Sequence, residues 1–178
     1  MRASNSKKGM TLVELLITMS LCGLVLAAST GSLLFLAKST RGLGNYQEMN
    51  MASRFALEDF GSDARMTSDV NSASDSRVSI EVYNSSGSTD TIVYSYDADA
   101  GTFSRTEGGV TRVLLEDVIT LSLNYFNLSG VALDSSPNPL EVKEIQLQAE
   151  MYREVMQIGN TNEIISARFM MRNRRVSS

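Results

Sequence analysis

The hydrophobic pattern of the chain changes twice and divides it into three parts. From Met10 to Ala37 the sequence is almost continuously apolar, and Glu14 is its only charged residue. A helix over this range is about 42 Å long at about 1.5 Å per residue, which exceeds the hydrocarbon core of a bilayer at about 30 Å. This first part therefore predicts a membrane-spanning helix.

The second part predicts an amphipathic continuation of the same helix to about Met66. Apolar residues recur there at spacings of three and four, which is the period of one helix face. The apolar stripe consists of Tyr46, Met49, Ala52, Ala56 and Phe60, and the opposite face carries Gln47, Arg54, Glu58 and Asp59. Gly42 and Gly44 each cost a helix about 1 kcal/mol relative to alanine. A second interpretation therefore has two helices joined by a loop at Arg41–Asn45.

In the third part the period changes to two, which predicts strands. We expect a polar loop at Asp69–Ser76, a long loop at 127–141 that contains both prolines, and a separator at Gln157–Glu163. The expected strands are 78–83, 91–96, 102–106, 110–115, 119–126, 142–152 and 164–171. One long helix followed only by strands indicates an α+β fold with an antiparallel sheet.

The apolar segment has more than one interpretation. A cleaved secretory signal has an apolar core of about 7–15 residues before a small-residue cleavage site. The run here is longer, although Leu26-Ala27-Ala28-Ser29 resembles such a site. An ordinary single-pass anchor accounts for the length but gives no use to Glu14, because a charge in the hydrocarbon layer costs about 2.5–3.5 kcal/mol on insertion scales. Lys7 and Lys8 favour a cytoplasmic N-terminus, and the basic residues after the segment weaken that asymmetry.

The residues around Glu14 form a motif that gives a third interpretation. Lys7-Lys8-Gly9 is followed by Met10-Thr11-Leu12-Val13-Glu14-Leu15-Leu16. This stretch resembles the cleavage and methylation motif of type IV pilins and type II secretion pseudopilins. The resemblance implies that a prepilin peptidase removes residues 1–9 after Gly9, and that Met10 becomes the N-methylated first residue. Met10 departs from the commoner phenylalanine, but cleavage depends most on Gly9.

The resemblance also gives Glu14 a function in assembly. Cleavage creates a positive amine at Met10, one helical turn before Glu14. When parallel helices pack with an axial stagger, Glu14 of one subunit can meet the amine of a neighbour. Removing one partner of a buried ion pair costs about 3–5 kcal/mol, so the pair fixes register. The alternative is a carboxylate that reaches the lipid headgroups from near the helix end.

The second half of the chain resembles minor pilins and J-type minor pseudopilins. The matching stretches are Ile92–Asp97, Phe103–Arg105, Val113–Val118, Leu123–Asn127 with Gly130, and Arg172-Asn173. Their order and spacing match along the domain. Together with the N-terminal motif, the resemblance covers most of the chain and implies a pilin-like fold. It favours a minor subunit that primes or tips a filament.

Composition limits the chemistry. The net charge of −4 argues against bulk binding to nucleic acid, and Cys22 is the only cysteine, so no intrachain disulfide forms. The chain has no histidine, the commonest general base and zinc ligand. Asp97–Gly101 fits a hairpin turn better than a calcium loop. We expect a solvated basic tail at Arg172, Arg174 and Arg175, no catalytic residues, no cofactor and no metal.

These observations predict a pilin or pseudopilin precursor with four segments. They are a cleaved leader (1–9), a transmembrane and assembly helix (10–37), an exported amphipathic helix (38–68) and a β-sheet domain (69–178). The expected partners are other pilin-like subunits, the prepilin peptidase and N-methyltransferase, an inner-membrane assembly platform and membrane lipid. The N-terminus is expected in the cytoplasm and the C-terminal domain outside the inner membrane. The rivals are a DNA-uptake pseudopilus, a membrane-anchored β-rich binding domain, and, remotely, an enzyme.

Overall fold

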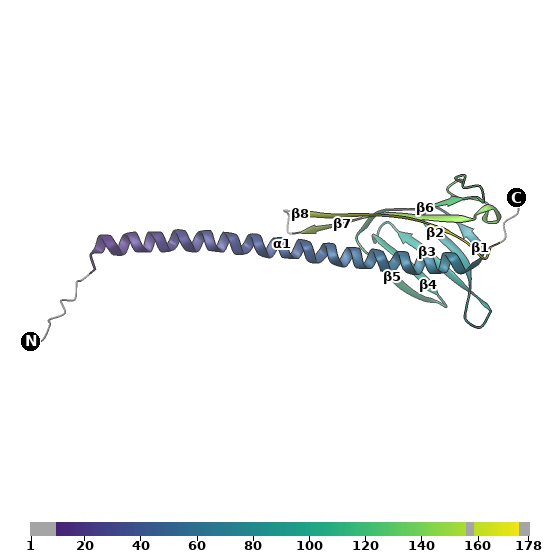
Figure 1. The fold of residues 1–178 in the computed structure, drawn as a ribbon, viewed down its shortest axis with the longest axis horizontal. Coiled ribbons are helices and arrows are strands. Elements are labelled where there is room, and N and C mark those ends of the chain that lie inside the picture. The colour runs from purple at the N-terminus through teal and green to yellow at the C-terminus, as the bar shows by residue number, and fades with distance from the viewer. Residues whose placement is uncertain (1–9, 156–158, 175–178) are drawn as a thin grey trace, which may run out of the picture. The chain divides into compact units, whose positions relative to one another are not determined.

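The computed structural model describes residues 10–155 and 159–174, and these form an α+β fold, as predicted. The chain divides into two compact units, Met1–Arg41 and Gly42–Ser178. Within the described ranges, one long helix, α1 (Leu12–Met66), precedes eight strands (Figure 1). Since α1 includes Gly42 and Gly44, the interpretation with a loop at Arg41–Asn45 is wrong. The predicted helix end at Met66 is confirmed.

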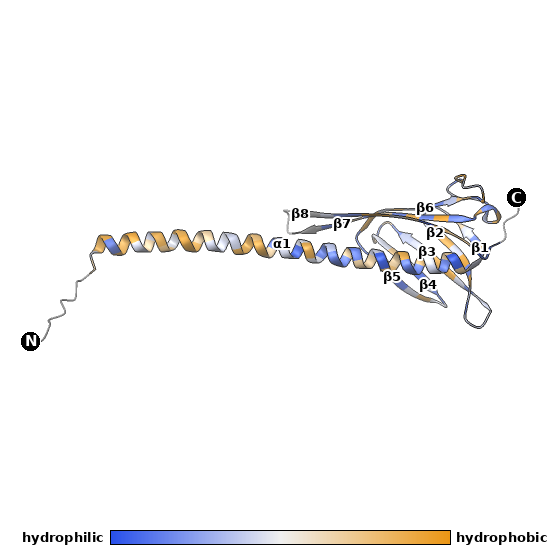
Figure 2. Ribbon diagram, viewed as in Figure 1, coloured by the Kyte–Doolittle hydropathy of each residue, from blue (hydrophilic) through white to orange (hydrophobic). Residues whose placement is uncertain are grey.

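In the first unit, α1 is mostly apolar (Figure 2). No residue of its most apolar stretch is buried, and by length and composition the helix is suited to crossing a membrane. Its hydroxyl groups donate to helix carbonyls: Ser20 to Leu16 at 2.9 Å, and Ser29 to Val25 and Thr30 to Leu26 at 2.8 Å. The helix therefore satisfies these polar groups by itself, as a bilayer requires.

The second unit contains two antiparallel sheets. The five-stranded sheet has the order β1-β2-β3-β4-β5 and the three-stranded sheet the order β6-β7-β8. The strands are β1 (Thr67–Ala73), β2 (Arg77–Tyr83), β3 (Thr89–Asp97), β4 (Thr102–Glu107), β5 (Val110–Leu115), β6 (Val118–Phe126), β7 (Glu144–Val155) and β8 (Gly159–Met170). A short 3-10 helix, Pro139–Glu141, lies in the predicted long loop.

The strand prediction is wrong at two places. Most of the expected loop Asp69–Ser76 is strand β1, which begins directly after α1 and pairs with β2 through two register shifts. Most of the expected separator Gln157–Glu163 is the start of β8, which pairs with β7 along its whole length. Residues 157 and 158 of that separator lie outside the described residues.

The core of the second unit forms around the part of α1 from Met49 to its end at Met66. The buried residues of α1 are Met49, Ser53, Ala56, Phe60, Gly61 and Ala64. The Phe60 ring centroid lies 4.8 Å from that of Tyr94 and 5.7 Å from that of Phe169, so this side chain packs on both sheets. A Cβ at Gly61 would overlap the Phe169 ring, so β8 approaches α1 closely because the residue is glycine. Tyr46 is 50% exposed and lies outside the buried face.

Candidate maturation and assembly site

The predicted processing site lies at the start of α1. Gly9 lies outside the described residues, and Met10 is 64% exposed. The helix begins at Leu12, and Glu14 lies exposed in its first turn. The described part of the site therefore presents an accessible Met10 one turn before the only carboxylate of the apolar segment.

Thr11 and Glu14 cap the helix reciprocally. The backbone N–H of Glu14 donates to the Thr11 hydroxyl at 3.2 Å, and the backbone N–H of Thr11 donates to the Glu14 carboxylate at 3.5 Å. This is a capping box, in which two N–H groups without helical partners are satisfied by side chains. The capping role of Thr11 was not predicted, although the spacing Thr-x-x-Glu before an apolar run is the sequence signal of a capping box.

The capping box also fixes the position of the Glu14 carboxylate at the start of the helix. A negative charge near a helix N-terminus is stabilised by the helix dipole by about 0.3–1 kcal/mol. Because the Glu14 side chain folds back toward Thr11, its carboxylate lies at the N-terminal end of the helix. The local hydrogen bonds thus keep the group in place without a partner chain.

The comparison with protein families agrees with this geometry. Residues 4–30 match the family model of the prokaryotic N-terminal methylation motif. The chain therefore carries the hallmark of type IV pilin and pseudopilin precursors, a class that is generally structural rather than enzymatic. The motif implies processing by a prepilin peptidase and assembly with other pilins, and the apolar helix fits a single-pass inner-membrane anchor. No curated protein matches the chain.

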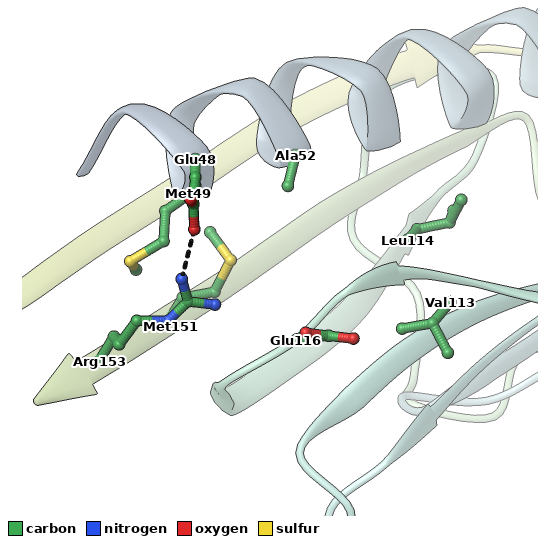
Figure 3. Close-up of a pocket in the computed structure, with 8 residues that line it drawn as sticks. All are labelled: Glu48, Met49, Ala52, Val113, Leu114, Glu116, Met151 and Arg153. Carbon is green, nitrogen blue, oxygen red and sulfur yellow. Dashed lines mark hydrogen bonds and ion pairs between the residues drawn. The ribbon is translucent and has the colours of Figure 1, made fainter. Parts of the chain in front are cut away.

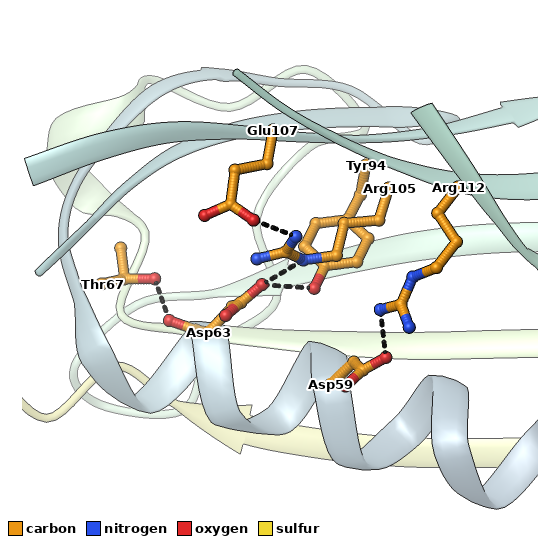
Figure 4. Close-up of polar contacts among 7 residues, drawn as sticks. All are labelled: Asp59, Asp63, Thr67, Tyr94, Arg105, Glu107 and Arg112. Carbon is orange, nitrogen blue, oxygen red and sulfur yellow. Dashed lines mark hydrogen bonds and ion pairs between the residues drawn. The ribbon is translucent and has the colours of Figure 1, made fainter. Parts of the chain in front are cut away.

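In the second unit, a partly buried polar cluster ties α1 to the five-stranded sheet (Figure 4). The Asp63 carboxylate accepts from the Tyr94 hydroxyl at 2.6 Å and from Arg105 Nε at 2.8 Å, and Arg105 Nη1 donates to Glu107 at 2.6 Å. Burial, and then the charge of Asp63, raise the pKa of Tyr94. The cluster is therefore a structural tie of two carboxylates, one guanidinium and a neutral phenol.

A further ion pair of this region is more exposed. Arg112 of β5 contacts Asp59 of α1 at 2.5 Å, and the Arg112 side chain is 61% exposed. Burial alone would lower the pKa of Arg105, but its bonds to Asp63 and Glu107 outweigh burial and raise it. The Asp63 side chain is 15% exposed and the Asp59 side chain is 37% exposed. Asp63, one turn after Asp59, is therefore the better shielded of these two carboxylates of α1.

A cavity of about 300 Å³ lies beside α1 (Figure 3). Its lining comprises Glu48, Met49, Ala52, Val113, Leu114, Glu116, Met151 and Arg153. Arg153 of β7 contacts Glu48 of α1 at 3.1 Å and Asp117 at 2.6 Å, and the hydrogen bond with Asp117 is the main cause that raises the pKa of Arg153. Asp117 has a positive φ of 57° in the turn from β5 to β6. Arg153 therefore ties both the helix and the inter-sheet turn to β7.

The predicted basic tail is wrong for Arg174. This side chain is 3% exposed and donates to the carbonyls of Val142 at 3.1 Å and of Pro139. Lys143 Nζ donates to the Arg174 carbonyl at 2.5 Å. Burial lowers the pKa of Arg174. Arg172 is exposed as expected, and Arg175 lies outside the described residues.

The acidic stretch Asp97–Gly101 forms the predicted hairpin turn. Asp97 Oδ1 accepts from the backbone N–H groups of Asp99 and Ala100, both at 3.0 Å. Such Asp-to-backbone bonds are typical of turns. The stretch therefore joins β3 to β4, and its first carboxylate serves the turn.

Proposed function

We propose that this chain is a minor pilin or pseudopilin subunit that is processed after Gly9 and assembled through its N-terminal helix. The assembly is a type IV pilus or a type II secretion pseudopilus. One observation carries the proposal: the methylation motif continues into an apolar helix whose most apolar stretch is not buried by any described residue. Exposed apolar surface of this extent needs lipid or other apolar helices around it.

The proposal gives each segment a place. Residues 1–9 are a cytoplasmic leader, and residues 10–37 lie in the inner membrane until assembly. The exported part begins with the amphipathic half of α1, assigned to residues 38–68, and continues into the β domain, assigned to 69–178. The change from helix to strand at Met66 and Thr67 supports a boundary close to that assignment.

Glu14 has two successive partners in this proposal. In the precursor, its carboxylate accepts from the Thr11 N–H. After cleavage, the methylated amine of Met10 is a cation, and Glu14 of one subunit pairs with the amine of a neighbouring subunit. An exchange between two satisfied states avoids an unpaired charge in an apolar medium, which is the costly situation. Thr11 thus serves as the temporary partner of Glu14.

Intact mass and N-terminal sequencing of the chain recovered from native membranes test the proposal. We expect a chain that starts at Met10 and is heavier by one methyl group. Gly9→Ala should block this maturation, whereas Gly23→Ala, at a helix glycine with open space around it, should leave it unchanged. A wild-type start at Met1 or Arg2 would contradict the proposal and favour a membrane-anchored β-rich binding domain. A start after Ala28 would indicate secretion.

A further inference from the structure

We propose that the edge strand β5 binds an extended segment of a different protein as an added strand. The segment carries an apolar side chain that packs beside Phe55 of α1 and, two positions away, a cation that faces Glu48 and Glu116. The inference goes beyond the proposed function. It does not depend on processing of the N-terminus, because every residue that it uses belongs to the second unit.

The edge of the five-stranded sheet at β5 is less protected than the edge at β1. Proteins protect edge strands with bulges, prolines, lysines or covering segments. Strand β1 has two register shifts and contacts the 3-10 helix, Pro139–Glu141. Strand β5 has no proline or lysine, and its register with β4 is regular from Val110 to Val113. Among the described strands, β5 pairs only with β4, so its other side is open to a further strand.

The hairpin turn before β5 determines which backbone groups of β5 point to that open side. Gly108 and Gly109 both have positive φ, at 56° and 82°, which is typical of a two-residue turn of type I′. Glu107 and Val110 flank this turn and pair with each other, so the Val110 N–H donates to the Glu107 carbonyl. Hydrogen-bonded pairs of an antiparallel ladder alternate with pairs that are not hydrogen-bonded. The alternation along β5 therefore starts with a hydrogen-bonded pair at Val110.

This alternation leaves two residues of β5 whose backbone groups do not bond to β4. Thr111 pairs with Thr106, and Val113 pairs with Ser104. In pairs of this kind the N–H and C=O groups point away from the partner strand, and hence to the open side of β5. Both Thr111 and Val113 are exposed. An added strand satisfies their backbone groups with main-chain hydrogen bonds, which supply the affinity in this mode of recognition.

The flank of α1 beside β5 exposes an aromatic ring. Phe55 is 61% exposed, although it lies in the half of α1 that packs on the sheets. It comes one turn before Asp59, which binds Arg112 of β5 at 2.5 Å. It comes one turn after Ala52, which lines the groove together with Val113 of β5. Since helix residues three and four apart share a face, Phe55 lies on the flank that adjoins β5. Exposed apolar side chains beside an open strand edge are features that proteins cover in their assemblies.

The end of β5 carries excess negative charge. The groove of about 300 Å³ lies there, and Glu48, Glu116 and Asp117 surround the guanidinium of Arg153. Arg153 binds Glu48 and Asp117, and the Glu48 side chain is still 74% exposed. Figure 3 shows Glu48 reaching from α1 toward Arg153, with Glu116 on the neighbouring segment. A partner that fits this end of β5 brings a cation, because a like charge is repelled.

The positions along β5 define the spacing of the partner's side chains. Strand β5 runs opposite to α1, since Arg112 binds Asp59 whereas Glu116 shares the groove with Glu48. Phe55 therefore lies between an ion pair and the acidic groove. Alternate residues of a strand point to the same face and are about 7 Å apart. An apolar residue beside Phe55, followed two positions later by a long cationic side chain, matches this arrangement.

A second copy of this chain does not supply such a segment through its own edge strand. The only cation of β5 is Arg112, and it already binds Asp59 of its own α1. Two paired β5 strands would therefore bring no free cation to Glu48 and Glu116. The occupant is a different protein, in agreement with a minor subunit that meets subunits of other kinds.

A synthetic peptide tests strand addition to the full chain in micelles. The probe is acetyl-Thr-Lys-Thr-Val-Thr-Lys-Thr-amide with a fluorescent label, and its symmetric sequence places a lysine two positions from the valine in either strand direction. Fluorescence anisotropy should show saturable binding with a Kd below about 1 mM. The same peptide with glutamate in place of lysine should bind at least about tenfold more weakly. No saturable binding, or equal binding of the two peptides, overturns the inference.

Backbone methylation tests whether the peptide binds as a strand. Successive amides of a strand point to opposite sides. N-methylation of the threonine amides therefore blocks one side, and N-methylation of the lysine and valine amides blocks the other. One of these peptides should bind at least about tenfold more weakly and the other within about twofold of the unmodified peptide. Equal effects would mean that only side chains are recognised, and would overturn strand addition.

Variants of the chain locate the site. Val113→Pro removes an N–H on the open side and no bond to β4, so it should weaken binding at least about tenfold. Val113→Thr keeps the N–H and should change binding less than about twofold. An unchanged denaturant midpoint separates loss of contact from misfolding. Glu116→Lys should reverse the preference for the lysine peptide, whereas Asp134→Lys, in an exposed loop, should keep it. A wild-type preference in Glu116→Lys overturns the inference.

Two further measurements separate this inference from its neighbours. A chain that keeps its leader but binds the lysine peptide at β5 overturns the proposed function and leaves the strand addition in place. A chain that starts at Met10 but does not bind the peptide does the reverse. A dimer in micelles that Val113→Pro dissociates, and that the peptide does not, would show that a second copy occupies the edge and would overturn the inference.

Discussion

The two halves of α1 differ in what buries them. In the first unit, the helix is almost wholly apolar, yet its most apolar stretch has no buried residue. In the second unit, the helix is mixed in character, yet Met49, Ala56 and Phe60 are each no more than 3% exposed. Hydrophobicity and burial thus run in opposite directions along one helix. The first half is built for surroundings outside the chain, and the second half for the sheets of its own chain.

This difference separates folding from assembly. Substitutions in the second half should change the free energy of unfolding of a single chain. Substitutions in the first half should leave that free energy alone and change association. The following predictions test this separation, beginning with the largest expected effect.

Glu14→Gln should abolish detectable assembly while leaving cleavage after Gly9 intact. The neighbour's amine would lose its counter-charge, at about 3–5 kcal/mol, which is more than about a hundredfold in the association equilibrium. The amount of subunit in sheared filaments or in cross-linked complexes, compared with the membrane fraction, measures this. Glu58→Gln, on the exposed face of the second half, is the control. Normal assembly of Glu14→Gln would contradict the function proposed for this carboxylate.

Asp63→Asn should lower the free energy of unfolding of the second unit by about 3 kcal/mol. It removes the anion that faces Arg105 and accepts from Tyr94, in a cluster where the Asp63 and Arg105 side chains are only 15% and 16% exposed. Asp59→Asn breaks a more exposed pair and should cost about 0–1 kcal/mol. Denaturant unfolding in micelles measures both. Equal effects of the two variants would show that shielding at Asp63 is unimportant.

Gly61→Ala should destabilise the second unit by up to about 2 kcal/mol. The new Cβ overlaps the Phe169 ring, and overpacking of a core typically costs about 1–3 kcal/mol, against about 1 kcal/mol gained in helix propensity. Gly44→Ala meets no atom within 4 Å and should instead stabilise the helix by about 1 kcal/mol. The opposite signs are read from the unfolding midpoints. A stabilised Gly61→Ala would mean that β8 shifts away from α1 at little cost.

The sequence predicted those parts of the fold in which periodicity coincides with burial. The helix end at Met66 followed from the spacing of its apolar residues, and strands β2 to β5 of the five-stranded sheet were also predicted. Strand β1 was not predicted, because only Val70 and Ala73 in it are apolar and its pairing with β2 is bulged. The division into two sheets was not predicted. The chain turns between them at Asp117, which has a positive φ, a conformation that usually requires glycine.

The buried hydrogen bonds and ion pairs were predicted less well than the apolar core. Asp63 follows Phe60 by three positions and so lies near the buried face, which is a signal for a paired carboxylate. Its partners Tyr94 and Arg105 are 31 and 42 residues away, and no local pattern specifies them. Arg174 was assigned to solvent because charged residues near an end usually are, but backbone carbonyls hold it. The surroundings of these charged side chains are therefore set by tertiary contacts, which the composition does not specify.

The second unit should also lose stability at alkaline pH. Burial raises the pKa of Tyr94 and of Tyr125, whose hydroxyl donates to the Ser74 carbonyl at 2.6 Å. In the unfolded chain both phenols ionise near pH 10, whereas in the folded unit they keep their protons. The unfolded state therefore binds fewer protons above about pH 10, and each tyrosine lowers the unfolding free energy by about 1.4 kcal/mol per pH unit there.

Denaturant midpoints followed by near-ultraviolet circular dichroism between pH 8 and pH 11 test this. Stability should be level up to about pH 10 and then fall, and Tyr125→Phe should halve the slope. Residues 1–41 contain no tyrosine, so the far-ultraviolet helix signal of the first unit should outlast the tyrosine signal of the second. Simultaneous loss of both signals would show that the two halves of α1 melt together, and would contradict the separation of folding from assembly.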